Sequence, residues 1–312
     1  MTVALALFVY AATMATWGAW LLRESAWPVR APRLAIAAWQ ALAFTVLSSV
    51  LLGGVALATR FHLVSTHVAD LIHVCMLNVR AGYGSPGRAA TTTLAIAVLL
   101  AVSTRAVWGA TITTQYAARQ LRRQLQILEL VARRDPQFDV LVLAHHAPAA
   151  FCFPGRGRSV VVTSSALDVL SPDELAAVIA HERAHLRGRH HLTVAIAQSL
   201  DCAFPGVPVF SWGQQQVRRL VELAADDLAC RHHRRSCIAS AILLLADAAP
   251  PAGTLALGSE AIHVRLRRLT EREAPLRRGL LNSLSGLIVV VLIAPAIVAA
   301  LSALAAAGVD YC

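Results

Sequence analysis

Long apolar stretches dominate the pattern of hydrophobic and polar positions along the chain. A helix needs about 20 residues to cross roughly 30 Å of hydrocarbon. Four stretches reach that length: Met1 to Leu22, Leu34 to Ala58, about Thr91 to Thr114, and Gly279 to Ala307. The first lacks the basic n-region and the small-residue cleavage site of a signal peptide, so we expect it to remain as a span. The pattern predicts a multi-pass α-helical membrane protein with four transmembrane helices (about 1–22, 34–58, 91–114 and 279–308).

The composition agrees with membrane spans and excludes several other classes. Hydrophobic residues make up 57% of the chain and charged residues 15%, whereas ordinary soluble domains have about 45–50% and about 25%. All 28 basic residues are Arg, against 18 acidic ones, which gives a net charge of +10. We attribute this charge to membrane flanks and expect no direct nucleic-acid binding. Six Cys without a CxxC pair do not form a disulfide scaffold or a zinc ribbon.

The distribution of Arg predicts the orientation in the cell membrane. Arg residues gather in three connecting segments (23–33, 115–134 and 265–278), while loop 59–90 has few of them. Positive charge stays on the cytoplasmic side. We therefore expect residues 115–278 to form a cytoplasmic domain, with both termini, loop 59–90 and the tail 309–312 outside. Arg105, within the third span, is expected to extend its side chain towards the cytoplasmic end.

The segment 115–278 reads as one α+β domain. Residues 115–134 are expected to form an Arg-rich helix that ends at Asp135-Pro136. Val140–Leu143 and Ser159–Thr163 are β-branched and predict short strands. Ser171-Pro172-Asp173-Glu174 has the pattern of a helix start, and the helix is expected to reach about Arg187. A further helix is expected over residues 214–230.

The expected helix 173–187 contains the motif His181-Glu182-Arg183-Ala184-His185. Residues four apart share a helix face, so both imidazoles can bind one metal ion. A catalytic zinc needs a third protein ligand, and Glu222 is the candidate. Asp226, four residues later, could accept a hydrogen bond from the far nitrogen of a ligand His. These spacings predict one Zn²⁺ per chain, although two solvated carboxylates on an amphipathic helix would have the same spacing.

HExxH followed by Glu222-Leu223-Ala224-Ala225-Asp226 resembles the gluzincin membrane metalloproteases, which include the prenyl-protein (CAAX) and HtpX-type enzymes. The runs Val160-Val161-Val162-Thr163, Leu170-Ser171-Pro172-Asp173-Glu174-Leu175 and Val178-Ile179-Ala180-His181-Glu182 carry the same resemblance. Three spans before the domain and one after it resemble the BlaR/MecR-type regulator peptidases more specifically. Those receptors continue into an external penicillin-binding sensor domain, and here four residues follow the last span. Direct beta-lactam sensing is therefore not expected.

The resemblance implies a fold, an activity and a role for each matching residue. It implies a gluzincin-like (zincin) domain that acts as a zinc endopeptidase on a cytoplasmic or membrane-proximal protein, in regulated proteolysis of a substrate such as a transcriptional repressor. The implied ligands are His181, His185 and Glu222, with Glu182 as general base and Asp226 behind the ligands. Candidates for stabilising the oxyanion are His232, His233 and Arg265. An edge strand for substrate is expected at Ser159, Val160, Val161 and Val162. The expected partners are a protein or peptide substrate and the lipid bilayer, and a homo-oligomer is compatible with this reading.

Several alternatives remain open at this point. Leu200-Asp201 faintly resembles the motif of site-2 intramembrane proteases, in which Asp201 would be the third ligand. A signalling scaffold without proteolysis is the alternative from a different class. The apolar run Thr193 to Trp212 is expected to be re-entrant, interfacial or buried under the domain. The paired histidines (145–146, 190–191 and 232–233) are expected to be solvated or capping residues. Cys75 and Cys312 would both be external and could form a disulfide.

Overall fold

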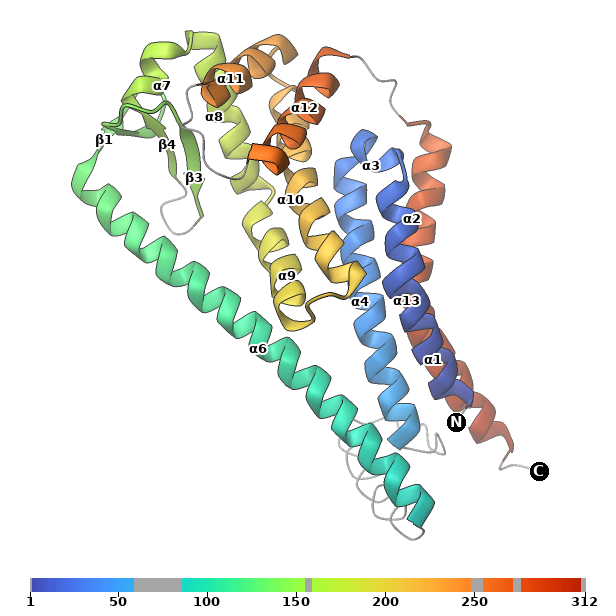
Figure 1. Ribbon diagram of the computed structural model, residues 1–312. Helices are drawn as coiled ribbons and strands as arrows, with labels where there is room; N and C mark the ends of the chain where they lie inside the picture. Colours follow the sequence, from blue (N-terminus) through green and yellow to red (C-terminus); the bar gives the residue numbers. More distant parts are fainter. Residues whose placement is uncertain (1, 59–85, 155–158, 248–254, 272–275, 310–312) are drawn as a thin grey trace.

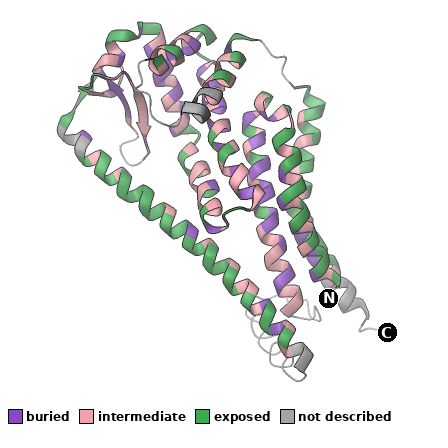
Figure 2. Ribbon diagram, viewed as in Figure 1, coloured by how far each residue is buried: buried purple, intermediate pink, exposed green. Residues whose placement is uncertain are grey.

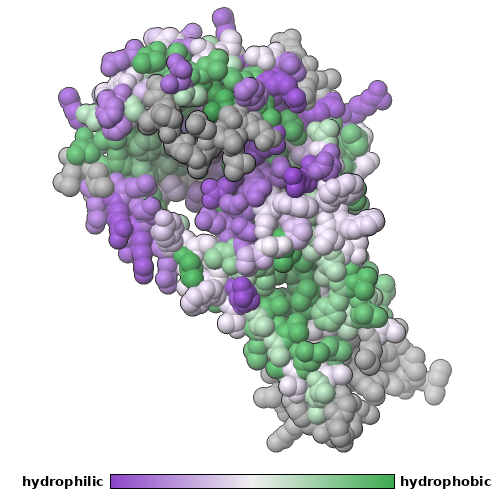
Figure 3. Space-filling view, viewed as in Figure 1, coloured by the Kyte–Doolittle hydropathy of each residue, from purple (hydrophilic) through white to green (hydrophobic). Residues whose placement is uncertain are grey.

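The computed structural model describes residues 2–58, 86–154, 159–247, 255–271 and 276–309, and these residues are mostly helical. Four helical segments are long and apolar enough to cross a membrane: Thr2–Glu24, Pro32–Ala58, Ala89–Gln126 and Arg278–Ser302. Each overlaps one of the four predicted spans, and the third extends further than its prediction. Hydrophobic side chains gather on the surface over the half of the molecule near the chain termini, and hydrophilic ones over the other half (Figure 3). Cys75, Cys312 and residues 59–85 lie outside the described residues.

Three of the spans form a bundle (Figure 1). The first consists of α1 (Thr2–Thr13), a π-helical turn η1 (Met14–Gly18) and α2 (Ala19–Glu24). A short α3 (Trp27–Arg30) leads into α4 (Pro32–Ala58), and the last span is α13 (Arg278–Val309). The Tyr10 hydroxyl donates to the Val291 carbonyl oxygen at 3.3 Å, which ties the first span to the last.

The third span continues without a break into the Arg-rich segment as one helix, α6 (Pro86–Val131). Most of its described side chains are exposed along its length (Figure 2). The prediction that this helix reaches residue 134 was wrong, because Ala132–Asp135 forms strand β1. The Asp135 carboxylate accepts the Gln137 backbone N–H at 2.7 Å, and Pro136 supplies no N–H, so the chain turns back as a hairpin.

A small sheet lies at the far end of α6 from the termini (Figure 1). Its strands are β1, β2 (Val140–Leu143), β3 (Ala150–Phe153) and β4 (Ser159–Thr163), in the order β1-β2-β4-β3. β2 and β4 are parallel, and the two other pairs are antiparallel. The two predicted strands are confirmed, but β4 is an inner strand. The expected edge strand at Ser159, Val160, Val161 and Val162 was therefore wrong, because β3 pairs along that side and is the outer strand.

In the described part of the chain, six helices complete the domain: α7 (Ser164–Val169), α8 (Pro172–Arg187), α9 (His190–Ala203), α10 (Pro208–Ala229), α11 (Arg235–Asp247) and α12 (Leu255–Thr270). The predicted start of α8 is confirmed: Ser171 and Glu174 form a capping box. Leu175, Val178 and Ile179 of α8 pack in one core cluster with Val162 of the sheet. This packing fixes the helix that carries the HExxH motif.

α9 lies directly against the third span. Gly109 of α6 allows this approach, because a Cβ there would come within 2.8 Å of Ala203 Cβ. One turn further, Thr113 and Ser199 share a hydrogen bond of 2.5 Å between their hydroxyl oxygens. Arg105 donates to the Ala203 carbonyl oxygen at 2.7 Å. The carbonyl at the end of α9 therefore gives Arg105 a hydrogen-bond partner within the protein, and the direction of its side chain relative to the cytoplasmic side stays a prediction.

α10 packs on the second span. Trp39 of α4 belongs to one core cluster with Phe210, Val217 and Leu220 of α10. Gly213 lets the helices meet, since a Cβ there would stand 3.3 Å from the Trp39 ring. The run Thr193 to Trp212 therefore resolves into most of α9, a turn and the start of α10, and α10 begins earlier than predicted.

Candidate metal centre

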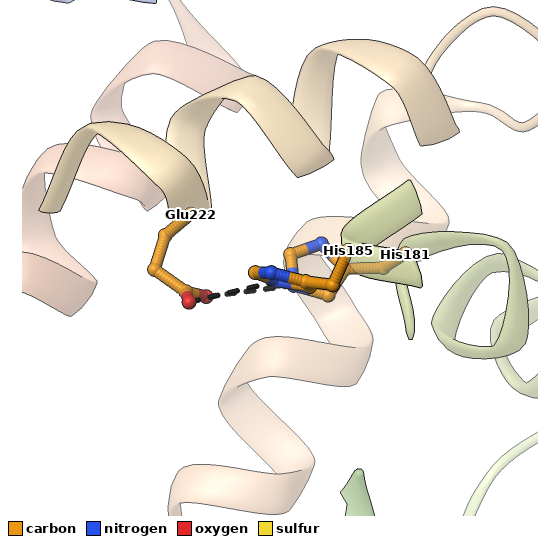
Figure 4. Close-up of side chains that lie close together, drawn as sticks. All are labelled: His181, His185 and Glu222. Carbon is orange, nitrogen blue, oxygen red and sulfur yellow. Dashed lines mark hydrogen bonds and ion pairs between the residues drawn. The ribbon is translucent and has the colours of Figure 1, made fainter. Parts of the chain in front are cut away.

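Three side chains from two helices converge on one point. His181 and His185 come from α8 and Glu222 from α10, and one potential ligand atom of each lies within 4.8 Å of the others (Figure 4). The two Nε2 atoms are 3.1 Å apart. Glu222 oxygens stand 3.5 Å from His181 Nε2 and 3.6 Å from His185 Nε2. Two imidazole nitrogens and one carboxylate oxygen are a donor set that fits a metal ion with an open coordination position.

The outer nitrogen of His181 faces a buried carboxylate. Its Nδ1 lies 2.9 Å from Asp226 Oδ1. Asp226, 1% exposed, in turn accepts two hydrogen bonds of 2.8 Å from Arg265 of α12. Arg265 also donates to Glu222 at 3.2 Å. The guanidinium therefore holds both carboxylates in place. Arg265 was a candidate for stabilising the oxyanion, and in this structure its donors already bind Asp226 and Glu222.

The electrostatics of this cluster favour a cation. Burial by itself disfavours a protonated His181, but the contacts with Asp226 and Glu222 outweigh it and raise the pKa of His181 to about 9. Burial likewise opposes ionisation of Glu222, but the contact with His181 and the charges of His181, His185 and Arg265 lower its pKa to about 2. Without a metal, a proton on His181 supplies the positive charge, so a metal ion would replace that proton.

The other two motif residues differ from His181 in their surroundings. Burial lowers the pKa of His185 to about 4, so its ring is neutral and can act as a ligand. Burial raises the pKa of Glu182 above its usual range. Cys152 of β3 lies beside Glu182, and burial together with that carboxylate raises the pKa of the thiol to about 12.

His190 approaches the cluster, which its sequence pattern did not reveal. Its Nδ1 lies 3.0 Å from Nδ1 of His185. The chain between α8 and α9 makes this possible: Arg189 has a left-handed φ of 49°, and a Cβ on Gly188 would clash with the His190 ring. A Gly-Arg-His turn directly after an HExxH helix is a signal that could have suggested the contact.

The cluster opens into a cleft of about 540 Å³. Its walls come from α6, β3, α8, α9 and α10, and they include Glu182, His185 and Glu222. The outer strand β3 contributes Phe151 and Cys152. His185 and Glu222 are therefore accessible to a molecule that enters between the sheet and the helices, whereas His181 is buried behind them.

Other predicted residues are not brought into this cluster. Asp201 is absent from the ligand group found among the described residues, and its carboxylate accepts a hydrogen bond from Ser211 at 2.7 Å. His232 and His233 lie beyond the end of α10 at Ala229, which is about 10 Å along the helix axis from Glu222. His145 and His146 stack on each other in the segment that follows β2.

Part of the chain is similar in sequence to known metalloproteases. Residues 112–207 match the model of peptidase family M48. The chain is 43% identical over 68 residues to a protease HtpX homologue of Salinibacter ruber. It is 36% identical over 96 residues to protease HtpX homologue 2 of Methanosarcina mazei, and 33% over 99 residues to a protease HtpX homologue of Aquifex aeolicus.

These matches cover 21%, 30% and 28% of this chain. The chain spans between 24% and 32% of the length of these curated relatives. No solved structure shows significant similarity to it. The family match includes the HExxH motif but ends before Glu222, whose place in the cluster comes from the geometry. Residues 112–207 are thus similar to a peptidase M48 domain, carried by a chain with four candidate membrane helices.

Proposed function

We propose that the protein is a membrane-anchored, zinc-dependent endopeptidase. The observation that carries the proposal is the His181–His185–Glu222 cluster, which lies beside Glu182 in an open cleft. The similarity of residues 112–207 to peptidase family M48 supports the same activity. Two imidazoles and a carboxylate are a common ligand set of catalytic zinc, which leaves a fourth position for water or substrate.

Zinc held by these three residues would lower the pKa of a bound water to about 7 and polarise the peptide carbonyl. Glu182 acts as general base: its carboxylate takes the proton of the attacking water and then delivers it to the leaving amine. Burial of Glu182 raises its pKa, which makes the carboxylate a better proton acceptor near neutral pH.

Three further side chains position the ligands. Asp226 contacts Nδ1 of His181, so Nε2 lies towards Glu222 and would be available to hold the metal ion. Arg265 fixes Asp226 and Glu222. His190 contacts Nδ1 of His185 in the same way. Each contact limits the rotation of a ligand side chain and selects its tautomer.

The outer strand β3 is the substrate-binding edge in this proposal. It lies at the end of the sheet, and its Phe151 and Cys152 line the cleft with Glu182. An extended peptide could pair with its backbone and bring a carbonyl to the metal. This role replaces the one expected for residues 159–162.

The proposed setting is the cell membrane, with the protease half in the cytoplasm. The Arg-rich flanks support this orientation. The cleft includes Ala117 of α6, just beyond the apolar part of the third span, so a substrate cleaved near the membrane surface fits best. Regulated cleavage of a signalling protein, as in the BlaR/MecR-type peptidases, is the role that the arrangement of spans supports.

The deciding experiment uses Glu182→Gln in the full chain, reconstituted with zinc. The variant should keep wild-type zinc content and lose about 10²–10⁴-fold in cleavage rate, the range for general-base catalysis. Glu271→Gln, an exposed carboxylate at the end of α12, is the matched control and should cleave normally. Full signalling by Glu182→Gln in cells would instead favour the non-proteolytic scaffold.

A further inference from the structure

Among the described residues that line the cleft, one carries a guanidinium that takes no part in the metal centre. Arg218 of α10 lines the cleft four residues before Glu222. Side chains at this spacing lie on one helix face, with Cβ atoms about 5–6 Å apart. Arg218 is therefore about one helical turn from a metal ligand, on the wall that a bound peptide would meet.

The partner of this guanidinium is neutral. Arg218 Nη2 donates to Gln198 Oε1 of α9 at 2.9 Å, and Gln198 also lines the cleft. Within the described ranges, no carboxylate lies at ion-pair distance from Arg218. Glu222 has suitable spacing but is turned towards the two histidines and Arg265.

Two other arginines near the centre, Arg265 and Arg268, are paired with carboxylates. Arg265 contacts Asp226 and Glu222, and Arg268 contacts Asp227 at 2.8 Å. Their guanidinium groups are neutralised by the fold, whereas that of Arg218 is held by one amide oxygen. Arginine has five N–H donors in a planar fork that matches a carboxylate. The donors left free on Arg218 can bind an acidic group from outside the chain.

The other residues that line the cleft indicate the chemical character of the molecule that would bind there. Apolar side chains from β3, α8, α9 and α10 line the same cleft as His185 and Glu222: Phe151, Leu186, Val194 and Val221. A ligand therefore presents an apolar part near the metal and a negative charge further along α10. A peptide with an apolar residue at the scissile bond and an acidic residue nearby meets both requirements.

We propose that Arg218, held by Gln198, is a specificity subsite for an acidic side chain of the substrate. An extended chain advances about 3.3 Å per residue, so a separation of one helical turn corresponds to about two residues from the scissile bond. The subsite selects Asp or Glu at that distance on one side of the bond. The inference rests on the proposed peptidase function and names its class of substrate.

The test uses the zinc-loaded full chain in lipid nanodiscs and matched fluorogenic peptides that differ only in Asp, Asn or Lys at each position near the scissile bond. Cleavage is measured with the wild-type protein and binding with Glu182→Gln. The Asp peptide should be favoured over the Asn peptide about fivefold, as for a partly exposed ion pair. Arg218→Gln should remove this preference, and Arg218→Glu should transfer it to the Lys peptide.

The control is Arg231→Glu, which makes the same charge change on an exposed residue just after α10 and should keep the Asp preference. Normal zinc content of each variant excludes a folding defect. An Asp preference that survives in Arg218→Gln would overturn the inference. The inference would also be overturned if Arg218→Gln bound anionic vesicles less well than the wild type but kept the Asp preference. That result would identify Arg218 as a binding site for lipid phosphate. Arg218-dependent binding without any cleavage by the wild type would retain the subsite and refute the peptidase.

Discussion

Replacing His190 by alanine removes the side chain that contacts the outer nitrogen of His185. In the present structure the two Nδ1 atoms are 3.0 Å apart. If Nε2 of His185 bound a metal ion, its Nδ1 would carry the proton and donate a hydrogen bond to Nδ1 of His190. The alanine variant leaves this N–H without its partner and lets the imidazole rotate in the cleft.

The expected loss of zinc affinity in His190→Ala depends on how exposed the contact between His185 and His190 is. Loss of the hydrogen-bond partner of a metal-ligating histidine typically costs about 10–100-fold in metal affinity, or about 1.4–2.8 kcal/mol. His185 and His190 both line the open cleft, so water can replace the lost acceptor. We therefore expect a loss near the lower limit, about tenfold.

The assay is a zinc titration of the purified full chain against a chromogenic chelator. His191→Ala removes the neighbouring imidazole from the same cleft and should bind zinc as the wild type does. His190→Asn places a polar atom close to the position of Nδ1 and should recover part of the affinity. If His190→Ala and His191→Ala bind zinc equally well, His190 has no positioning role.

The remaining predictions concern the ligands, the pH dependence and the topology. Glu222→Ala should lose stoichiometric zinc, while Asp201→Ala should retain it; zinc lost only from the Asp201 variant would restore the site-2 reading. Because the pKa of His181 in the metal-free protein is about 9, zinc must displace a proton below that pH. Its apparent affinity should rise about tenfold per pH unit between pH 7 and 8.5, and a plateau from pH 7 would contradict the raised pKa. In intact cells, cysteines introduced between residues 252 and 259 should be protected from a thiol reagent and those between residues 82 and 87 labelled; the reverse pattern would invert the topology.

The parts of the fold that sequence reasoning predicted are those with strong local signals. Spans of 20 apolar residues and the Ser171 capping box depend on hydrogen bonds within one segment, so they are visible in the chain itself. The missed parts depend on contacts between distant segments. β3 is a strand because it pairs with β4, and Arg105 has a partner because α9 ends beside it. The partner of Arg105 lies 98 residues away in the sequence, and no local pattern shows that β3 pairs with β4.

The same distinction holds for the candidate site. His181, Glu182 and His185 were predicted because one helix turn brings them together. Glu222 and Asp226 were candidates from their spacing of four residues and from the family resemblance, and the structure brings both to the histidines. Arg265 was predicted to lie near the site with a different role. His190 was missed because its approach depends on the backbone of Gly188 and Arg189.

The contact of α9 with Gly109 links the geometry of the site to the thickness of the bilayer. α6 is a single helix of 46 residues, about 69 Å long, so less than half of it can lie in hydrocarbon of about 30 Å. A span longer than its bilayer responds to thickness by tilting. Because α9 is fixed to the third span at Gly109 and Thr113 and begins at His190, a change in the tilt of α6 would move the residue that contacts His185.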